Sequence, residues 1–306
     1  MNVLFLGTPA FAVQSLNALA NSSHKVVGVI TQPDRAVKRG KTESSPVKYA
    51  AVRLGLPVFQ PDRIRDETDC LKSYGADIAV TAAYGQILTQ GVLDCFPKGV
   101  INVHASLLPK YRGASPIYSA ILNGEKITGV TIMKTELGLD TGDILSAEEV
   151  EIGRDETATE LTERLAVVGA KLLIDTLDRF DDIKPIKQDD EFATKCKTIK
   201  KDETYIDFGK SAEQVVNQVR ALCESPCARA VLDGQVYKIY KVVRTDADYA
   251  GVPGQVVECG NRLVVACGYG AVEIKSIQAP GKNRLDIADF LRGRKFAVGE
   301  SFGKPQ

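Results

Sequence analysis

Short apolar runs alternate with helix-like segments through the first half of the chain. The strand-like runs are 2–6, 25–30, 76–83, 99–105, 129–136 and 143–152, and segments with helical spacing are 10–20, 45–55, 115–124 and 158–180. This alternation predicts an α/β fold, a doubly wound parallel or mixed sheet with helices on both faces. Such sheets bind ligands beyond the carboxyl ends of their strands. The turns after Leu6, Ile30, Ala82 and Val103 are therefore the first places to look for a site.

Two helix starts can be predicted from their capping residues. Ser45 followed by Pro46 is typical of an N-cap and a first helical position, and Thr8 followed by Pro9 has the same form. We therefore expect helices to begin at both places.

The pattern changes near residue 185. Residues 184–203 are polar and lysine-rich, without strong periodicity, and we interpret them as a linker. One helix, expected at 211–222, then precedes several short strand-like runs separated by turn residues. Regularly spaced short strands predict a small barrel or sandwich.

Composition excludes several broad classes. The 306 residues carry 39 basic and 39 acidic side chains, so no net charge attracts nucleic acid or an anionic membrane, and such contacts must come from local patches. No apolar run approaches the roughly 20 residues that span a bilayer. The seven cysteines are irregularly spaced and provide no zinc-binding pattern. We expect scattered reduced thiols, no metal, no membrane contact and a cytoplasmic location.

One of the two histidines lies in the stretch NVHASLLPKYRG. Asn102 and His104 are two residues apart at the end of an expected strand, so both side chains point to one face. Downstream, the turn GLDTGD places Asp140 after a strand that can lie beside the first. An Asn, a His and an Asp together suit acyl or formyl transfer, because the first two can stabilise an oxyanion and the Asp can orient the His. A structural histidine and a turn-forming Asp remain open on spacing alone.

The longer strings resemble the folate-dependent formyltransferases. VHASLLPKYRGASPI followed by GVTIMKTELGLDTGDIL is similar to the signature of this family, which moves a formyl group from 10-formyltetrahydrofolate to an amine. The resemblance implies that Asn102, His104 and Asp140 are the catalytic residues. It also implies that two stretches border the folate pocket, with the residues Ser106, Leu107, Leu108, Pro109, Tyr84, Gly85 and Ile87.

Further strings indicate the acceptor. FLGTPAFAVQSL (5–16), TQPDRAVKRGKTESSPVK (31–48) and the C-terminal part resemble those family members that formylate methionine on initiator methionyl-tRNA. The resemblance implies a Rossmann-like catalytic domain at 1–185, a linker at 186–203 and an OB-like tRNA-binding domain at 204–306, in a monomer. The basic loop that would grip the tRNA carries Arg35, Lys38, Arg39 and Lys41, although a solvated charged turn is the ordinary alternative for any one of them.

Three other functions remain to be distinguished. A dinucleotide-binding enzyme is disfavoured because LGTPAF lacks the G-x-G-x-x-G fingerprint, with Pro9 in place of a glycine. A relative with another acceptor, such as a nucleotide-sugar amine or water, would keep the catalytic residues. A noncatalytic RNA-binding module is also possible in principle, but few aromatic residues in the C-terminal strands indicate base stacking.

Overall fold

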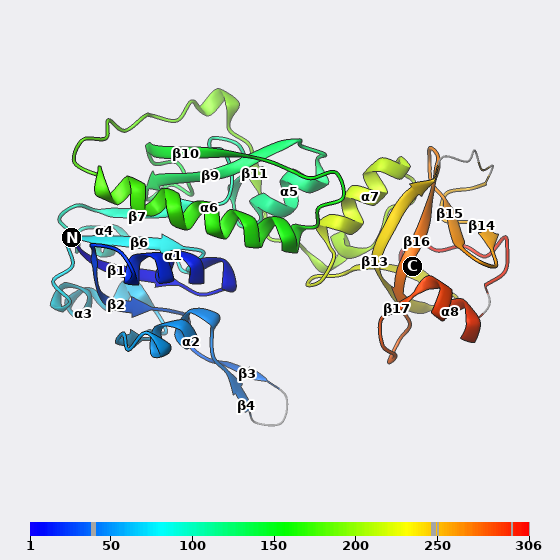
Figure 1. Cartoon of the computed structure of the whole chain (residues 1–306), viewed down its shortest axis with the longest axis horizontal. Coiled ribbons are helices and arrows are strands. Elements are labelled where there is room, and N and C mark those ends of the chain that lie inside the picture. Colours follow the sequence, from blue (N-terminus) through cyan, green and yellow to red (C-terminus); the bar gives the residue numbers. More distant parts are fainter. Residues whose placement is uncertain (38–40, 246–248, 250, 295, 306) are drawn as a thin grey trace. The chain divides into compact units, whose positions relative to one another are not determined.

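The computed structural model describes residues 1–37, 41–245, 249, 251–294 and 296–305. Contacts divide the chain into two units (Figure 1). The first contains residues 1–116, 127–151 and 162–196, and the second contains residues 117–126, 152–161 and 197–306. Residues 186–196, which the sequence analysis assigns to the linker, make their contacts within the first unit.

A seven-stranded mixed sheet forms the centre of the first unit. Its spatial order is β10-β9-β7-β6-β1-β2-β5, in which β5, β2, β1, β6 and β7 are parallel, whereas β9 is antiparallel to both β7 and β10. The strands are β1 (Asn2–Gly7), β2 (Lys25–Ile30), β5 (Val58–Phe59), β6 (Ile78–Ala82), β7 (Val100–His104), β9 (Ile127–Lys134) and β10 (Ile144–Glu151). The predicted α/β fold with a parallel or mixed sheet is confirmed.

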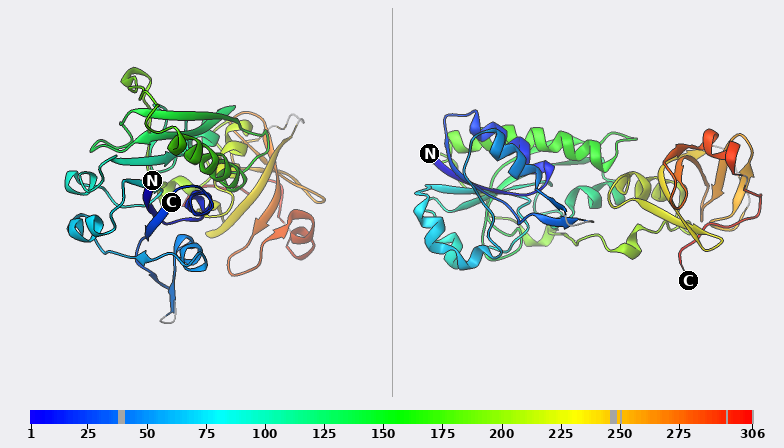
Figure 2. Two further views of the ribbon diagram at one scale, coloured as in Figure 1. Left: turned by 60° about the vertical axis from the view of Figure 1, so that its left-hand side comes forward. Right: turned by 90° about the horizontal axis from the view of Figure 1, so that it is seen from below.

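Helices cover both faces of this sheet (Figure 2). Leu4, Leu6 and Val100 pack with Leu71 of α3 and Val92 of α4 on one face. Gly169 of α6 packs closely on the opposite face, where a Cβ atom would lie 3.0 Å from the side chain of Val103. The helices are α1 (Ala10–Ala20), α2 (Pro46–Arg53), α3 (Thr68–Ser73), α4 (Gln90–Leu93), α5 (Pro116–Leu122) and α6 (Ala158–Asp178).

One of the two predicted caps is confirmed. The Ser45 side chain accepts a hydrogen bond from Lys48 N at the start of α2, with Pro46 in the first turn, and such a cap is worth about 1 kcal/mol. The Thr8 cap is wrong, because Pro9 is the N-cap of α1 and no side chain caps it. The Thr8 hydroxyl donates instead to the carbonyl of Tyr84, which joins the turns after β1 and β6.

Short two-stranded sheets complete the first unit. β3 (Arg35–Val37) and β4 (Lys41–Glu43) pair as an antiparallel hairpin after β2. β8 (Arg112–Gly113) pairs in parallel with β11 (Lys195–Cys196), so a segment far along the chain lies against the turn that follows β7.

The second unit is built on an antiparallel sheet with the order β12-β13-β16-β15-β14, and β17 also pairs with β16. Its elements are α7 (Ala212–Ala221), β12 (Ala228–Leu232), β13 (Gln235–Thr245), β14 (Val256–Cys259), β15 (Leu263–Ala266), β16 (Ala271–Gln278), β17 (Leu285–Asp286) and α8 (Ile287–Gly293). Ser211 and Gln214 form a capping box on α7. No two of the described strands join the edges of this sheet, but Gly303 pairs with Val231 of β12 and Ser301 pairs with Gln255 beside β14.

The core of the second unit lies between this sheet and its helices. Tyr237 and three phenylalanines form an aromatic cluster, with ring centroids between 5.6 and 6.4 Å apart. Val215 and Val219 of α7 and Phe290 of α8 belong to the same buried cluster. No helix among the described residues is long and apolar enough to cross a membrane.

Candidate active site

Asn102 and His104 lie at the carboxyl end of β7, as the sequence predicts. Strand alternation places them on the same face as Val100, which packs with α3 and α4. His104 is 5 % exposed, whereas Asn102 is half-buried. The two polar side chains therefore lie at the carboxyl end of β7, on the face of the sheet that α3 and α4 cover.

The surroundings of His104 fix which ring nitrogen can act. Nε2 lies 3.0 Å from the carbonyl oxygen of Tyr111. A carbonyl oxygen only accepts, so Nε2 carries a proton and donates it. Nδ1 faces the carboxylate of Asp140, with 3.7 Å between Nδ1 and Oδ2. The two ring nitrogens thus have different partners, and the Nδ1 edge is the one that faces the Asp140 carboxylate.

Asp140 reaches this position from the turn between β9 and β10. Its Oδ2 accepts a hydrogen bond of 2.8 Å from Gly113 N. Gly113 has a φ of +126°, and a Cβ there would lie 2.0 Å from the carbonyl oxygen of Cys196, so a larger residue does not fit. The structure therefore brings together the His and the Asp that the sequence places 36 residues apart.

Thr81 orients the third side chain. Its hydroxyl lies 2.8 Å from Asn102 Oδ1 and donates to it. Because Asn102 Oδ1 accepts this hydrogen bond, the NH₂ group is the part of the Asn102 amide that can donate to another molecule. Thr81 lies on β6, the neighbour of β7, and nothing in its local sequence marks it as part of a site.

Hydrogen bonds within the turn and to β9 hold the segment that follows His104. The fully buried Ser106 donates from its hydroxyl to Lys110 O and accepts from Thr131 Oγ1 at its carbonyl. Leu108 N donates to the same Thr131 hydroxyl oxygen. Leu107 packs so closely on β9 that a Cβ on Gly129 would lie 2.5 Å from it. The half-buried Pro109 ends this turn. The contacts of the turn fix the backbone between His104 and the Tyr111 carbonyl.

The turn after β6 holds the other predicted folate residues. Tyr84 is 4 % exposed and packs in the core, and burial raises the pKa of its phenol. Its carbonyl accepts from Thr8 Oγ1 and Gln32 Nε2. Gly85 has a φ of +92°, which explains the glycine, whereas the side chain of Ile87 is 86 % exposed.

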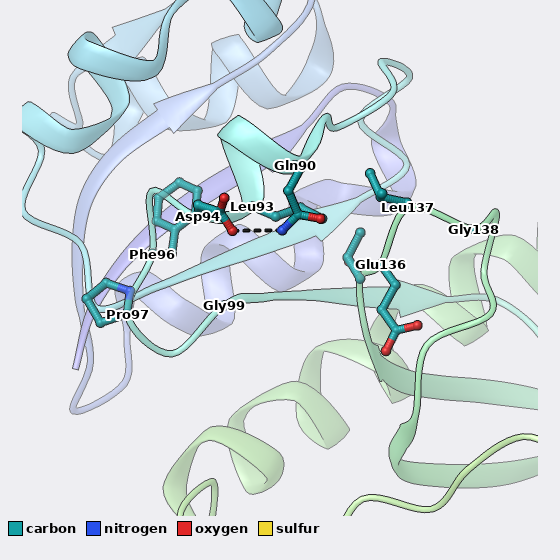
Figure 3. Close-up of a pocket in the computed structure, with 10 residues that line it drawn as sticks. Gln90, Leu93, Asp94, Phe96, Pro97, Gly99, Glu136, Leu137 and Gly138 are labelled. Carbon is teal, nitrogen blue, oxygen red and sulfur yellow. Dashed lines mark hydrogen bonds between the residues drawn. The ribbon is translucent and has the colours of Figure 1, made fainter.

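A cavity of about 750 Å³ opens between α4 and the start of the turn that carries Asp140 (Figure 3). Its volume is within the range of small-molecule sites. It is lined by Gln90, Leu93, Asp94, Phe96, Pro97, Gly99, Thr135, Glu136, Leu137 and Gly138. The Thr135 hydroxyl oxygen is buried without a hydrogen-bond partner among the described residues. The residues predicted from the sequence to border a folate pocket are not among those that line this cavity.

The basic loop contains the β3–β4 hairpin. Arg35 is exposed and stands opposite Glu43, while Lys38 and Arg39 lie outside the described residues. Lys41 begins β4.

Asp34 anchors the base of the hairpin. Its carboxylate accepts from Gln60 Nε2 at 2.8 Å, from Lys48 Nζ at 2.7 Å and from Ser44 Oγ at 3.1 Å. The bonds from Gln60 and Lys48 lower the pKa of Asp34. Lys48, the last residue of the stretch 31–48, is thus paired with Asp34.

Comparison with known proteins places both parts of the chain in one family. Residues 1–177 match the family described as formyl transferase, and residues 198–295 match the formyl transferase C-terminal domain. The chain is 46 % identical over 309 residues to a methionyl-tRNA formyltransferase of Solibacter usitatus, covering 99 % of each chain. It is 44 % identical over 311 residues to one of Streptococcus agalactiae, again covering 99 % of each.

A solved structure shares the fold. An N-formyltransferase from Helicobacter canadensis, in complex with folinic acid and dTDP-3-aminofucose, superposes with a TM-score of 0.68 at 21 % identity, over 90 % of this chain and 98 % of that one. Together with the full-length relatives, the two matched domains show that the chain belongs to the formyltransferase family, among the methionyl-tRNA formyltransferases.

Proposed function

We propose that the protein transfers the formyl group of 10-formyltetrahydrofolate to the α-amino group of methionine on initiator methionyl-tRNA. The observation that carries this proposal is the contact of 3.7 Å between His104 Nδ1 and the Asp140 carboxylate, beside the Asn102 amide. The identity of 42–46 % to methionyl-tRNA formyltransferases over 99 % of the chain supports the choice of acceptor.

The three side chains divide the work of the transfer. The methionine amine attacks the formyl carbon, so a C–N bond forms and the carbonyl oxygen becomes an oxyanion. His104 Nδ1–H and the Asn102 amide donate to that oxyanion. Asp140 stabilises the imidazolium and takes the proton that the amine loses, through water. The intermediate then breaks its bond to N10 of the folate, and N10 takes the proton that Asp140 received from the amine.

The bond from His104 Nε2 to the Tyr111 carbonyl explains why Nδ1 does this work. It occupies one edge of the ring and holds the other toward Asp140. A ring fixed in this way does not reorganise when charge develops, which is the source of electrostatic catalysis at such a site.

The cavity beside the Asp140 turn suits the heterocycle of the formyl donor. Its wall ends at Gly138, two residues before Asp140. Leu137 offers an exposed apolar surface at this wall. We also assign donor contacts to Ile87, whose side chain is exposed, and to Tyr84, Gly85, Ser106, Leu107, Leu108 and Pro109.

The acceptor is held by other parts of the chain. We assign the phosphate contacts to Arg35, Lys38, Arg39 and Lys41 in the hairpin loop, because a basic loop after β2 lies at the carboxyl end of the sheet. Residues 204–306, which belong to the second unit, are assigned to tRNA binding. Its five-stranded antiparallel path supports an OB-like organisation.

The protein acts as a monomer in the cytoplasm, in this proposal. One chain supplies Asn102, His104 and Asp140, so the catalytic constellation needs no second copy. The relatives are named for a tRNA substrate of translation, which supports a cytoplasmic location.

A competition assay tests the proposed function. The purified chain is given 10-formyltetrahydrofolate with charged initiator tRNA, a nucleotide-sugar amine, a purine-precursor amine or water alone. We expect formylmethionyl-tRNA as the main product. Formylation of a small amine in preference to the tRNA, or release of formate without an acceptor, would assign the chain to another branch of the family.

A further inference from the structure

The turn that carries Asp140 is strained and needs support. Asp140 has a φ of +53°, a conformation that residues other than glycine seldom adopt and that costs on the order of 1–3 kcal/mol. Its neighbour Gly142 lies so close to β9 that a Cβ there would be 2.0 Å from Lys134 O. Such a turn persists only where surrounding contacts determine it.

Gln188 supplies these contacts. Its side-chain NH₂ group donates to Asp140 O at 2.9 Å and to Gly142 O at 2.7 Å. Both protons of the amide are thus used on the backbone of one turn, and Gln188 is only 6 % exposed. The residue comes from the polar stretch after α6, in which the sequence shows no periodic element.

Arg112 in turn fixes Gln188. Its Nε donates to Gln188 Oε1 at 3.0 Å, and its Nη2 pairs with Asp190 Oδ1 at 2.8 Å. Arg112 is 5 % exposed, so its charge is neutralised at the surface by Asp190. Every polar atom of the Gln188 amide therefore has a partner, which leaves it one orientation.

The same segment also holds the turn on the histidine side. Thr194 Oγ1 accepts from Tyr111 N at 2.8 Å, and Cys196 Sγ donates to the Tyr111 carbonyl at 3.3 Å. That carbonyl is the acceptor for His104 Nε2. Residues 188–196 thus contact both backbone segments that aim the reacting groups.

We propose that Gln188 is a positioning residue of the transfer reaction, which it serves by holding Asp140 at its distance from His104, with Arg112 acting through Gln188. This inference rests on the proposed function. Neither residue touches the reacting atoms. A displacement of the order of 1 Å at a catalytic group costs about 10²-fold in rate, so we expect a lower kcat and nearly unchanged KM values for the folate and the tRNA.

The test compares Gln188→Ala with Gln218→Ala. Gln218 is also 6 % exposed and also donates to two backbone carbonyls, those of Glu203 and Tyr205, but it lies in the second unit. Both variants lose buried hydrogen bonds, and thermal unfolding measures that loss. We expect kcat to fall about 10²-fold for Gln188→Ala and to stay within about threefold of wild type for Gln218→Ala.

Two further variants refine this test. One asks whether Gln188 acts as a hydrogen-bond donor or only by packing, and the other asks whether Arg112 acts through Gln188. Gln188→Glu keeps the size and the acceptor for Arg112 but loses both donors, so kcat should fall as in the alanine variant. The double variant Gln188→Ala with Arg112→Met should be no slower than the slower single variant, because both changes release the same turn.

The outcomes are distinguishable from failure of the proposed function, because that failure is seen in the wild-type chain. If the wild type formylates methionyl-tRNA but Gln188→Ala and Gln218→Ala have equal kcat values, the positioning role is wrong. Normal activity of Gln188→Glu, or losses that multiply in the double variant, would also overturn it.

Discussion

Replacement of Asp140 by asparagine removes one negative charge and almost no volume. The Asn side chain can still accept the hydrogen bond from Gly113 N, so the fold of the turn is kept. What is lost is the carboxylate 3.7 Å from His104 Nδ1. The side chains of His104 and Asp140 are 6 % and 14 % exposed, so solvent screens this pair little.

The expected fall in kcat follows from this distance between the two charges. Two unit charges about 4 Å apart attract by about 4 kcal/mol at an effective dielectric constant of about 20. Each 1.36 kcal/mol of barrier is about tenfold in rate. Loss of a general base lowers rates by about 10²–10⁴-fold. We therefore expect kcat of Asp140→Asn to fall by about 10²–10³-fold.

Single-turnover formylation of methionyl-tRNA measures this change, with binding of the tRNA followed in parallel. Asp182→Asn is the matched control, since it makes the same substitution at an exposed position. We expect wild-type rates for this control. A kcat within tenfold of wild type for Asp140→Asn, or an equal loss in the control, would refute the reasoning.

Three other predictions concern the acceptor, the donor and the thiols. Arg39→Ala should lower kcat/KM for the tRNA about tenfold and flatten its salt dependence; an unchanged salt dependence of tRNA binding would remove this residue from recognition. Leu137→Asp should raise the KM for the folate donor about tenfold at nearly constant kcat, measured at saturating tRNA, and an unaltered KM would place the donor elsewhere. Burial raises the pKa of Cys267 to about 12 and of Cys227 to about 11. At pH 8 their thiolate fractions are therefore about 10⁻³ or less, and a disulfide reagent should modify the half-buried Cys70 and Cys259 first, whereas fast modification of all seven cysteines would contradict the buried positions.

The sequence predicts those parts of the site that lie on regular elements. β7 is a short apolar strand, and its alternation alone is enough to place Asn102 and His104 on one face. Asp140 follows from its position in a turn after a neighbouring strand. The resemblance to the folate-dependent formyltransferases adds the catalytic roles of these residues, which stay predictions.

The parts that escape prediction depend on contacts between distant segments. Thr8 looks like a helix cap, yet its hydroxyl bonds the Tyr84 carbonyl, because tertiary contact overrides a local signal. Gln188 stands in a polar stretch that resembles a linker, and only the fold brings it to the Asp140 turn, 48 residues away. The cavity likewise joins α4 to a turn more than 40 residues further along the chain.

The most direct test of the account is the single-turnover rate of His104→Ala with 10-formyltetrahydrofolate and methionyl-tRNA, combined with equilibrium binding of each substrate. Removal of the imidazole takes away the donor to the oxyanion and leaves both substrate surfaces intact. We predict a rate at least about 10²-fold below wild type with both affinities within about threefold. A rate within tenfold of wild type, or a loss fully explained by weaker tRNA binding, would contradict the assignment of His104 as the centre of the reaction.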